Sequence, residues 1–148
     1  MRLRICGSMA GMNYTHIALA SLGATVAYFV YGFGLFAAWP SLQTEFLKFP
    51  NVYRPKDEMM KKMPFGMITI LISIVVVAVL YAKAYAVDGG IVPGALFGVL
   101  IGIFMVCVFV MHNYVNLNIG LKLSVYQGIV YFVQWVIVGA AIGLIYRP

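Results

Sequence analysis

Apolar residues form four long runs along the chain, and all but one of the charged residues lie between or outside them. A helix needs roughly 20 residues, at about 1.5 Å each, to cross a hydrocarbon core of about 30 Å. Each run meets this length, and in lipid such segments can satisfy their backbone groups only as helices. The sequence therefore predicts an all-α polytopic membrane protein, with four transmembrane helices in one bundle formed by residues 1–148. The predicted spans are 17–39, 65–87, 91–111 and 123–146.

The longest connection, 40–64, is predicted to lie on the membrane interface. Leu42, Phe46 and Phe49 recur there at helical spacing, which is typical of a short amphipathic helix. Before the second span, two acid-to-base pairs at i, i+4 spacing predict a helical turn. These pairs are Asp57 with Lys61 and Glu58 with Lys62. The sequence Asp88-Gly89-Gly90 predicts a tight turn, and 116–122 a short polar link.

Composition excludes a soluble domain, because 64% of residues are hydrophobic and only 9% are charged. The net charge of +6 is explained by basic residues beside the spans, facing lipid headgroups, so no nucleic-acid partner is expected. Six Lys or Arg lie on the side of the long loop and four on the side of the termini; a start at Met12 makes the ratio six to two. This bias favours an orientation with loop 40–64 in the cytoplasm. A true start at Met1, Met9 or Met12 remains open.

The residues that membrane enzymes and proton-driven transporters need are missing from the predicted spans. They contain no Asp or Glu, which disfavours a proton relay. No paired carboxylates, Ser-His-Asp set or phosphate-binding loop occurs, so a non-enzymatic protein is expected. His16 and His112 are predicted on opposite membrane faces, about 30 Å apart. Since Cys6 and Cys107 also lack metal-ligand spacing, we expect neither a metal nor a cofactor.

Glycines at helical spacing predict a close helix–helix contact. Small residues let helices approach in lipid, where packing relies on van der Waals contact. The spacing favours a partner helix in the same chain, with another copy as the alternative. The predicted packing residues are Gly94, Gly98, Gly102, Gly139 and Gly143.

One polar cluster is the candidate site. His112 follows Gly94 by eighteen residues, five helical turns, so it is expected on the glycine face and inside the bundle. Asn116, Ser124 and Gln127 are expected at the same membrane face, beneath the basic loop. Two interpretations stay open: hydrogen-bonded caps that close two helices, or a site for a lipid headgroup or small solute.

A second polar feature lies at the membrane midplane. An unpaired amide in hydrocarbon is costly, so Gln134 needs a partner, for which Tyr28 is the candidate. Ser124, Gln127, Tyr131 and Gln134 form one stripe on the fourth span. The stripe is expected to hold helices together, and a lined solute path is the alternative.

Several segments resemble a widespread group of small four-helix bacterial membrane proteins of unknown function. They are the Met-Asn-Tyr of 12–14, YGFGLFAAWP, GALFGVLIG, HNYVNLN and YQGIVYFVQWVIVGAAIGLIY. The resemblance implies a four-helix fold in the bacterial inner membrane and assigns no functional residue.

Together these observations favour a protein that acts through helix packing, as a homo-oligomer or as an accessory subunit of a larger membrane complex. Its expected partners are the lipid bilayer and other membrane subunits or copies of itself. The alternative is a transporter or channel for a small solute or lipophilic ligand, built from two or more copies.

Overall fold

The computed structural model describes residues 13–84 and 89–146, and every regular element within them is helical. Four helical segments are long and apolar enough to cross a membrane, which confirms the all-α fold with four candidate spans. The third of these segments consists of α4, a π-helical piece and α5. The elements are α1 (Tyr14–Ala38), α2 (Pro40–Leu47), α3 (Lys56–Ala84), α4 (Ile91–Met105), the π-helix η2 (Val106–Met111), α5 (His112–Asn116) and α6 (Leu121–Ile145).

Three of the four predicted spans agree with the helices to within five residues at each end. The second helix starts nine residues earlier than its predicted span, because α3 incorporates the charged turn at its start and continues through Pro64. Asp57 and Glu58 occupy its first turn, where carboxylates stabilise the helix dipole. Met1, Met9 and Met12, Asp88 of the predicted turn and residues 85–87 of the second predicted span lie outside the described residues.

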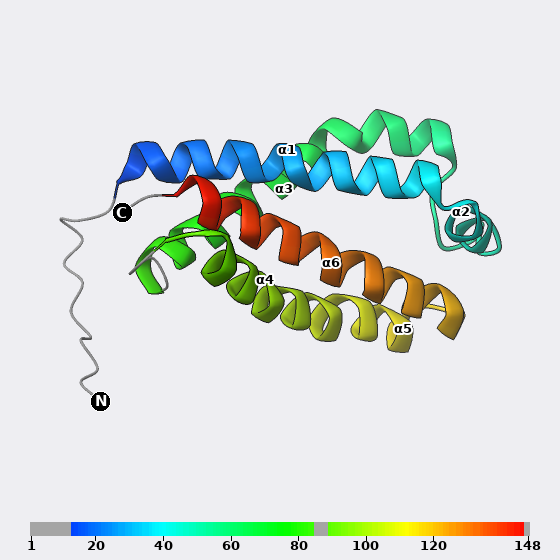
Figure 1. The fold of residues 1–148 in the computed structure, drawn as a ribbon. Coiled ribbons are helices and arrows are strands. Elements are labelled where there is room, and N and C mark those ends of the chain that lie inside the picture. The colour runs from blue at the N-terminus through cyan, green and yellow to red at the C-terminus, as the bar shows by residue number, and fades with distance from the viewer. Residues whose placement is uncertain (1–12, 85–88, 147–148) are drawn as a thin grey trace.

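The centre of the fold is α6, which packs against α4 on one side and α1 on the other (Figure 1). In α1 the buried residues recur every three or four positions, so that one face of the helix turns inward. Ala20 and Ala24 on this face are fully buried, and their small size lets α1 approach its neighbours closely. The buried core contains Ile17, Ala20, Ala24, Tyr28, Ile74, Val77, Ala78, Tyr81, Phe97, Trp135, Val138, Ile142 and Tyr146.

The predicted glycines lie in the contact between α4 and α6. A Cβ placed on Gly98 would lie 2.9 Å from the Cα of Val136, and one on Gly139 would lie 2.6 Å from the Cα of Gly98. Gly94 faces the backbone of Gly139 and Gly143 in the same way. The backbones themselves therefore touch, and the partner helix belongs to the same chain.

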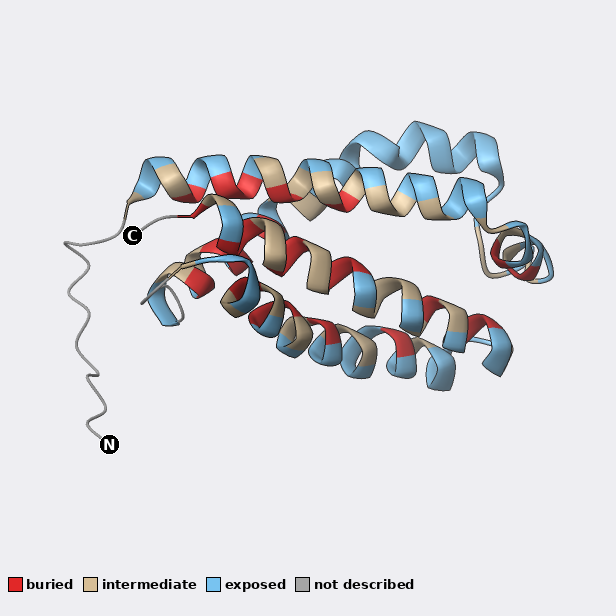
Figure 2. Ribbon diagram, viewed as in Figure 1, coloured by how far each residue is buried: buried red, intermediate tan, exposed pale blue. Residues whose placement is uncertain are grey.

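Helix α3 is attached to the fold only through its second half. Every residue from 56 to 69 is exposed, whereas Ile74, Val77, Ala78 and Tyr81 are buried. Figure 2 shows the first half of α3 exposed along its whole length. The second half of α3 borders an apolar groove that it shares with α4, η2 and α6.

The third span changes its helical pitch at η2, where six residues are wound as a π-helix. A π-helix has more residues per turn than an α-helix, so the buried face continues in steps of four from Gly102 towards Val110, which is 1% exposed. The expected position of His112 assumed an uninterrupted 3.6-residue period. That prediction is wrong, because the π segment turns His112 to the exposed surface.

Candidate functional site

The four residues of the predicted cluster do not form one site. His112 and Asn116 are exposed, and the Asn116 amide donates to the carbonyl oxygen of His112 in its own helix. Ser124 is buried and donates to the carbonyl oxygen of Gly120, 3.4 Å away. The amide of Gln127 donates to the Tyr53 hydroxyl at 3.0 Å. The π-helical winding changes which residues of the third span face α6, so that His112 and Asn116 lie on the exposed surface.

The midplane pair is brought together as the sequence predicts. The side-chain amide of Gln134, which is 4% exposed, donates a 3.0 Å hydrogen bond to the backbone carbonyl oxygen of Tyr28. Gly32, one turn further along α1, leaves room for this amide, because a Cβ there would lie 2.9 Å from the Gln134 nitrogen. The bond links α1 to α6 and satisfies a donor that is costly to leave unpaired in hydrocarbon.

Helix α2 packs its apolar face against the start of α6. Leu42 is 3% exposed and packs with Ile119 and Leu123, while Phe46 and Phe49 flank this cluster. The predicted apolar face therefore exists, but it covers protein. Pro40 begins the helix at its first turn, where the missing N–H of proline costs no hydrogen bond.

A buried carboxylate fixes α2 to α6. The Glu45 side chain is 7% exposed and lies 2.8 Å from the ammonium groups of both Lys122, at the start of α6, and Lys48. The Lys122 hydrogen bond, followed by that of Lys48, holds the pKa of the Glu45 carboxyl below its ordinary value. These charge-assisted bonds offset the free-energy cost of burying the Glu45 carboxylate between α2 and α6.

Acidification is expected to release α2. A carboxyl with a lowered pKa in the folded state contributes stability above its ordinary pKa of about 4.3, and loses that contribution as the pH falls through the lowered value. Trp39 packs on Tyr126, with 4.9 Å between ring centroids, so its fluorescence reports the attachment. In a Trp135→Phe background, fluorescence should change below pH 4.3, and Glu45→Gln should remove this transition. Glu58→Gln is the control and should keep the transition, because Glu58 only meets Arg54 in an exposed pair at 3.6 Å. An unchanged transition in Glu45→Gln would show that Glu45 does not cause the release of α2.

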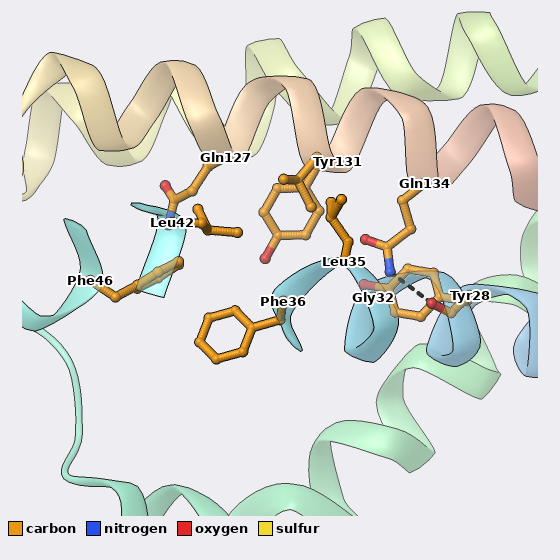
Figure 3. A pocket seen from close by; sticks show the side chains of 10 residues that line it. Tyr28, Gly32, Leu35, Phe36, Leu42, Phe46, Gln127, Tyr131 and Gln134 are labelled. Carbon is orange, nitrogen blue, oxygen red and sulfur yellow. Dashed lines mark hydrogen bonds between the residues drawn. The ribbon is translucent and has the colours of Figure 1, made fainter. Parts of the chain in front are cut away.

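Between α1, α2 and α6 lies a cavity of about 210 Å³, which we name the α2 cavity. Figure 3 shows Tyr131 pointing its hydroxyl into this space, with Leu35 drawn between it and the Gln134 amide. Leu42 and Phe46 of α2 form one wall, and Leu35 and Phe36 of α1 another. The full lining is Tyr28, Gly32, Leu35, Phe36, Leu42, Phe46, Gln127, Val130, Tyr131 and Gln134.

Sequence reasoning placed Gln127, Tyr131 and Gln134 on one face of α6, and the structure brings all three to the α2 cavity. It missed Glu45 and Tyr53, whose roles depend on contacts across long stretches of chain. A signal for Glu45 was present, because it lies between Leu42 and Phe46 on a helix that must cover something apolar. Tyr53 had no comparable signal.

The lining of the α2 cavity contains amide and phenol groups but no charged side chain. In the part of the chain that the structure describes, no three His, Cys, Asp or Glu residues gather as metal ligands would. The cavity therefore suits hydrogen bonding to a neutral molecule better than it suits ion binding.

The fold and its four long apolar helices define a multi-pass helical membrane protein. Comparison with protein-family models, with curated proteins and with solved structures finds no match to this chain.

Proposed function

We propose that this protein is a non-enzymatic packing subunit of the membrane, which associates with a second copy of itself through α3. The main support for this proposal is the groove beside α3, which has a volume of about 490 Å³. It is bordered by α3 on one side and by α4, η2 and α6 on the other. Its lining on α3 includes Val76 and Leu80, and on the opposite side Phe104, Met105 and Phe109.

The groove needs an apolar occupant. Its walls are almost entirely apolar, and Ser73 on its α3 side donates to the carbonyl oxygen of Thr69 in its own helix. Water inside it would find few hydrogen-bond partners. A transmembrane helix can fill such a groove with continuous van der Waals contact, the interaction that drives helix association in lipid.

Charges at the start of α3 favour a second copy as the occupant. Within the described residues, Asp57, Lys61 and Lys62 have no ion pair in their own chain, and Glu58 has only the exposed pair with Arg54. In a dimer with its two-fold axis along the membrane normal, the two α3 helices begin at the same depth, and identical residues are level. The lysines of one copy then lie four residues, about 6 Å along the helix, from the acidic residues of the other. The long lysine side chains can span this offset, so that unlike charges pair between copies.

The inner membrane of a bacterium, with loop 40–64 in the cytoplasm, is part of the proposal. Six basic residues on the side of the loop, against four on the side of the termini, support this orientation. With Cys6 and Cys107 replaced by alanine, Lys56→Cys should resist a membrane-impermeant thiol reagent on intact cells, whereas Thr15→Cys should react. The opposite pattern would reverse the orientation and leave the four spans unaffected.

Native mass spectrometry from mild detergent tests the association. Wild type should appear as a dimer, and Val76→Trp should be monomeric, because Val76 lines the groove and is 54% exposed. Val26→Trp is the matched control: Val26 is 62% exposed on α1, outside the groove lining, so this variant should stay dimeric. A monomeric wild type, or equal dimer fractions for the two variants, would refute the proposal. A defined complex with a different membrane protein would refute the second copy and favour an accessory subunit.

A further inference from the structure

Several polar side chains line the α2 cavity with hydrogen-bonding capacity to spare, among them Gln134 and Tyr131 of α6. The Gln134 nitrogen donates to Tyr28, but the amide oxygen of Gln134 has no hydrogen-bond donor among residues 13–84 and 89–146. The Tyr131 hydroxyl makes no hydrogen bond in that part of the chain, and its ring packs edge-on against Phe109. Figure 3 shows both side chains reaching in from α6, with Leu35 drawn between them and the Tyr131 hydroxyl pointing towards Phe36 and Leu42. The cavity therefore offers separate hydrogen-bonding positions, of which the Tyr131 hydroxyl can both donate and accept.

The apolar walls of the α2 cavity determine which kind of molecule fits it best. Leu35, Phe36, Leu42, Phe46 and Val130 are apolar, so a cluster of water molecules would lack partners over most of its surface. An acyl chain would match these walls but would leave the amide oxygen and the hydroxyl unpaired in hydrocarbon. An occupant with an apolar body and a polar end satisfies both parts of the lining.

Size and charge narrow the class of ligand. A cavity of about 150 Å³ is sufficient for benzene, and this one has about 210 Å³. No ionised side chain lines it, so a charged molecule would be desolvated without compensation. We propose that the α2 cavity binds a neutral six-membered ring compound that carries a hydroxyl group, such as a monocyclic phenol, with the ligand hydroxyl hydrogen-bonded to the Tyr131 hydroxyl.

The α2 cavity and the groove of the proposed dimer contact share Tyr28 and Tyr131 in their linings but lie between different helices. The α2 cavity lies between α1, α2 and α6, whereas the groove lies beside α3 and the third span. Val76 lines the groove only, so ligand binding in Val76→Trp should equal that of wild type. Tyr131→Phe keeps the ring in the groove, so its dimer fraction should equal that of wild type, and the loss of ligand binding is measured separately from the dimer.

Fluorine NMR of 4-fluorophenol added to the protein in lipid nanodiscs tests the site. The probe should bind saturably, at one site per chain, above its partition into empty nanodiscs. Fluorobenzene has the same ring without the hydroxyl, and it should bind at least three times more weakly. Tyr131→Phe removes one hydroxyl and should weaken 4-fluorophenol binding about three- to tenfold, as expected for one hydrogen bond.

Tyr126→Phe is the matched control. Tyr126 lies on the same helix, packs on Trp39 and does not line the cavity, so its loss of a hydroxyl should leave binding unchanged. Circular dichroism and the thermal midpoint check that each variant is folded. Partition identical to empty nanodiscs, equal affinity of wild type and folded Tyr131→Phe, or equal affinity for fluorobenzene would each overturn the proposal.

Discussion

Replacing Gly98 by leucine is expected to separate α4 from α6 and to destabilise the fold strongly. The new side chain would start at a Cβ only 2.9 Å from the Cα of Val136, and backbone cannot move aside as a flexible side chain does. Overpacking usually costs about 1–3 kcal/mol, and a contact with backbone places this change at or above the upper end. Thermal unfolding in detergent, followed by circular dichroism, measures the loss.

Gly34→Leu provides the control for this experiment. Gly34 lies in α1, another long apolar helix, and a Cβ there would have no heavy atom within 4 Å. Its replacement should change stability by less than about 0.5 kcal/mol. Similar midpoints for the two variants would show that α4 and α6 are not held in backbone contact.

Tyr81→Ala is expected to detach α3. The Tyr81 side chain is fully buried, with ring centroids 5.5 Å from Phe97 and 6.2 Å from Tyr146. The first half of α3 contributes no buried residue, so the helix is held by its second half, where Tyr81 is the largest fully buried side chain. Truncating a buried aromatic residue typically costs 3–5 kcal/mol; we expect about 3 kcal/mol, because lipid can refill part of the space. A spin label on α3 paired with one on α1 would record the increased separation.

Tyr81→Phe keeps the ring and both aromatic contacts, so it should retain most of the stability and the short label distance. If Tyr81→Phe loses as much stability as Tyr81→Ala, the attachment depends on the hydroxyl and not on ring packing. Unchanged label distances in Tyr81→Ala would show that α3 is held elsewhere.

The parts of the fold that follow from short-range periodicity could be predicted from the sequence. The four spans follow from length and hydropathy, which need no knowledge of neighbours. The placement of Gln134 against Tyr28 follows from the cost of an unpaired amide, although the acceptor is the backbone carbonyl oxygen and not the phenol. In both cases the physical requirement is local and strong.

The orientation of His112 could not be predicted from local periodicity. Its predicted orientation extrapolated one period over eighteen residues, and the π-helical segment Val106–Met111 changes that period before His112 is reached. An apolar sequence such as VCVFVM gives no sign of the change, because each of its residues suits α- and π-helical winding in lipid equally. The α2 cavity was also unpredictable, since it depends on α2 packing against α6, with their contacting residues about 80 positions apart.

The hydrogen bond between Gln134 and Tyr28 joins residues separated by 106 positions, and this separation has a consequence for biosynthesis. During translation α1 leaves the ribosome well before its principal partner, α6, which follows the other described helices. The glycine face of α4 also has no partner until α6 is made. Until α6 is inserted, both surfaces face lipid or the insertion machinery, and the bundle cannot close. A nascent chain halted before Leu121 should therefore be membrane-inserted but unpacked and open to quality-control proteases, because insertion of α6 completes the packing of α1 and α4.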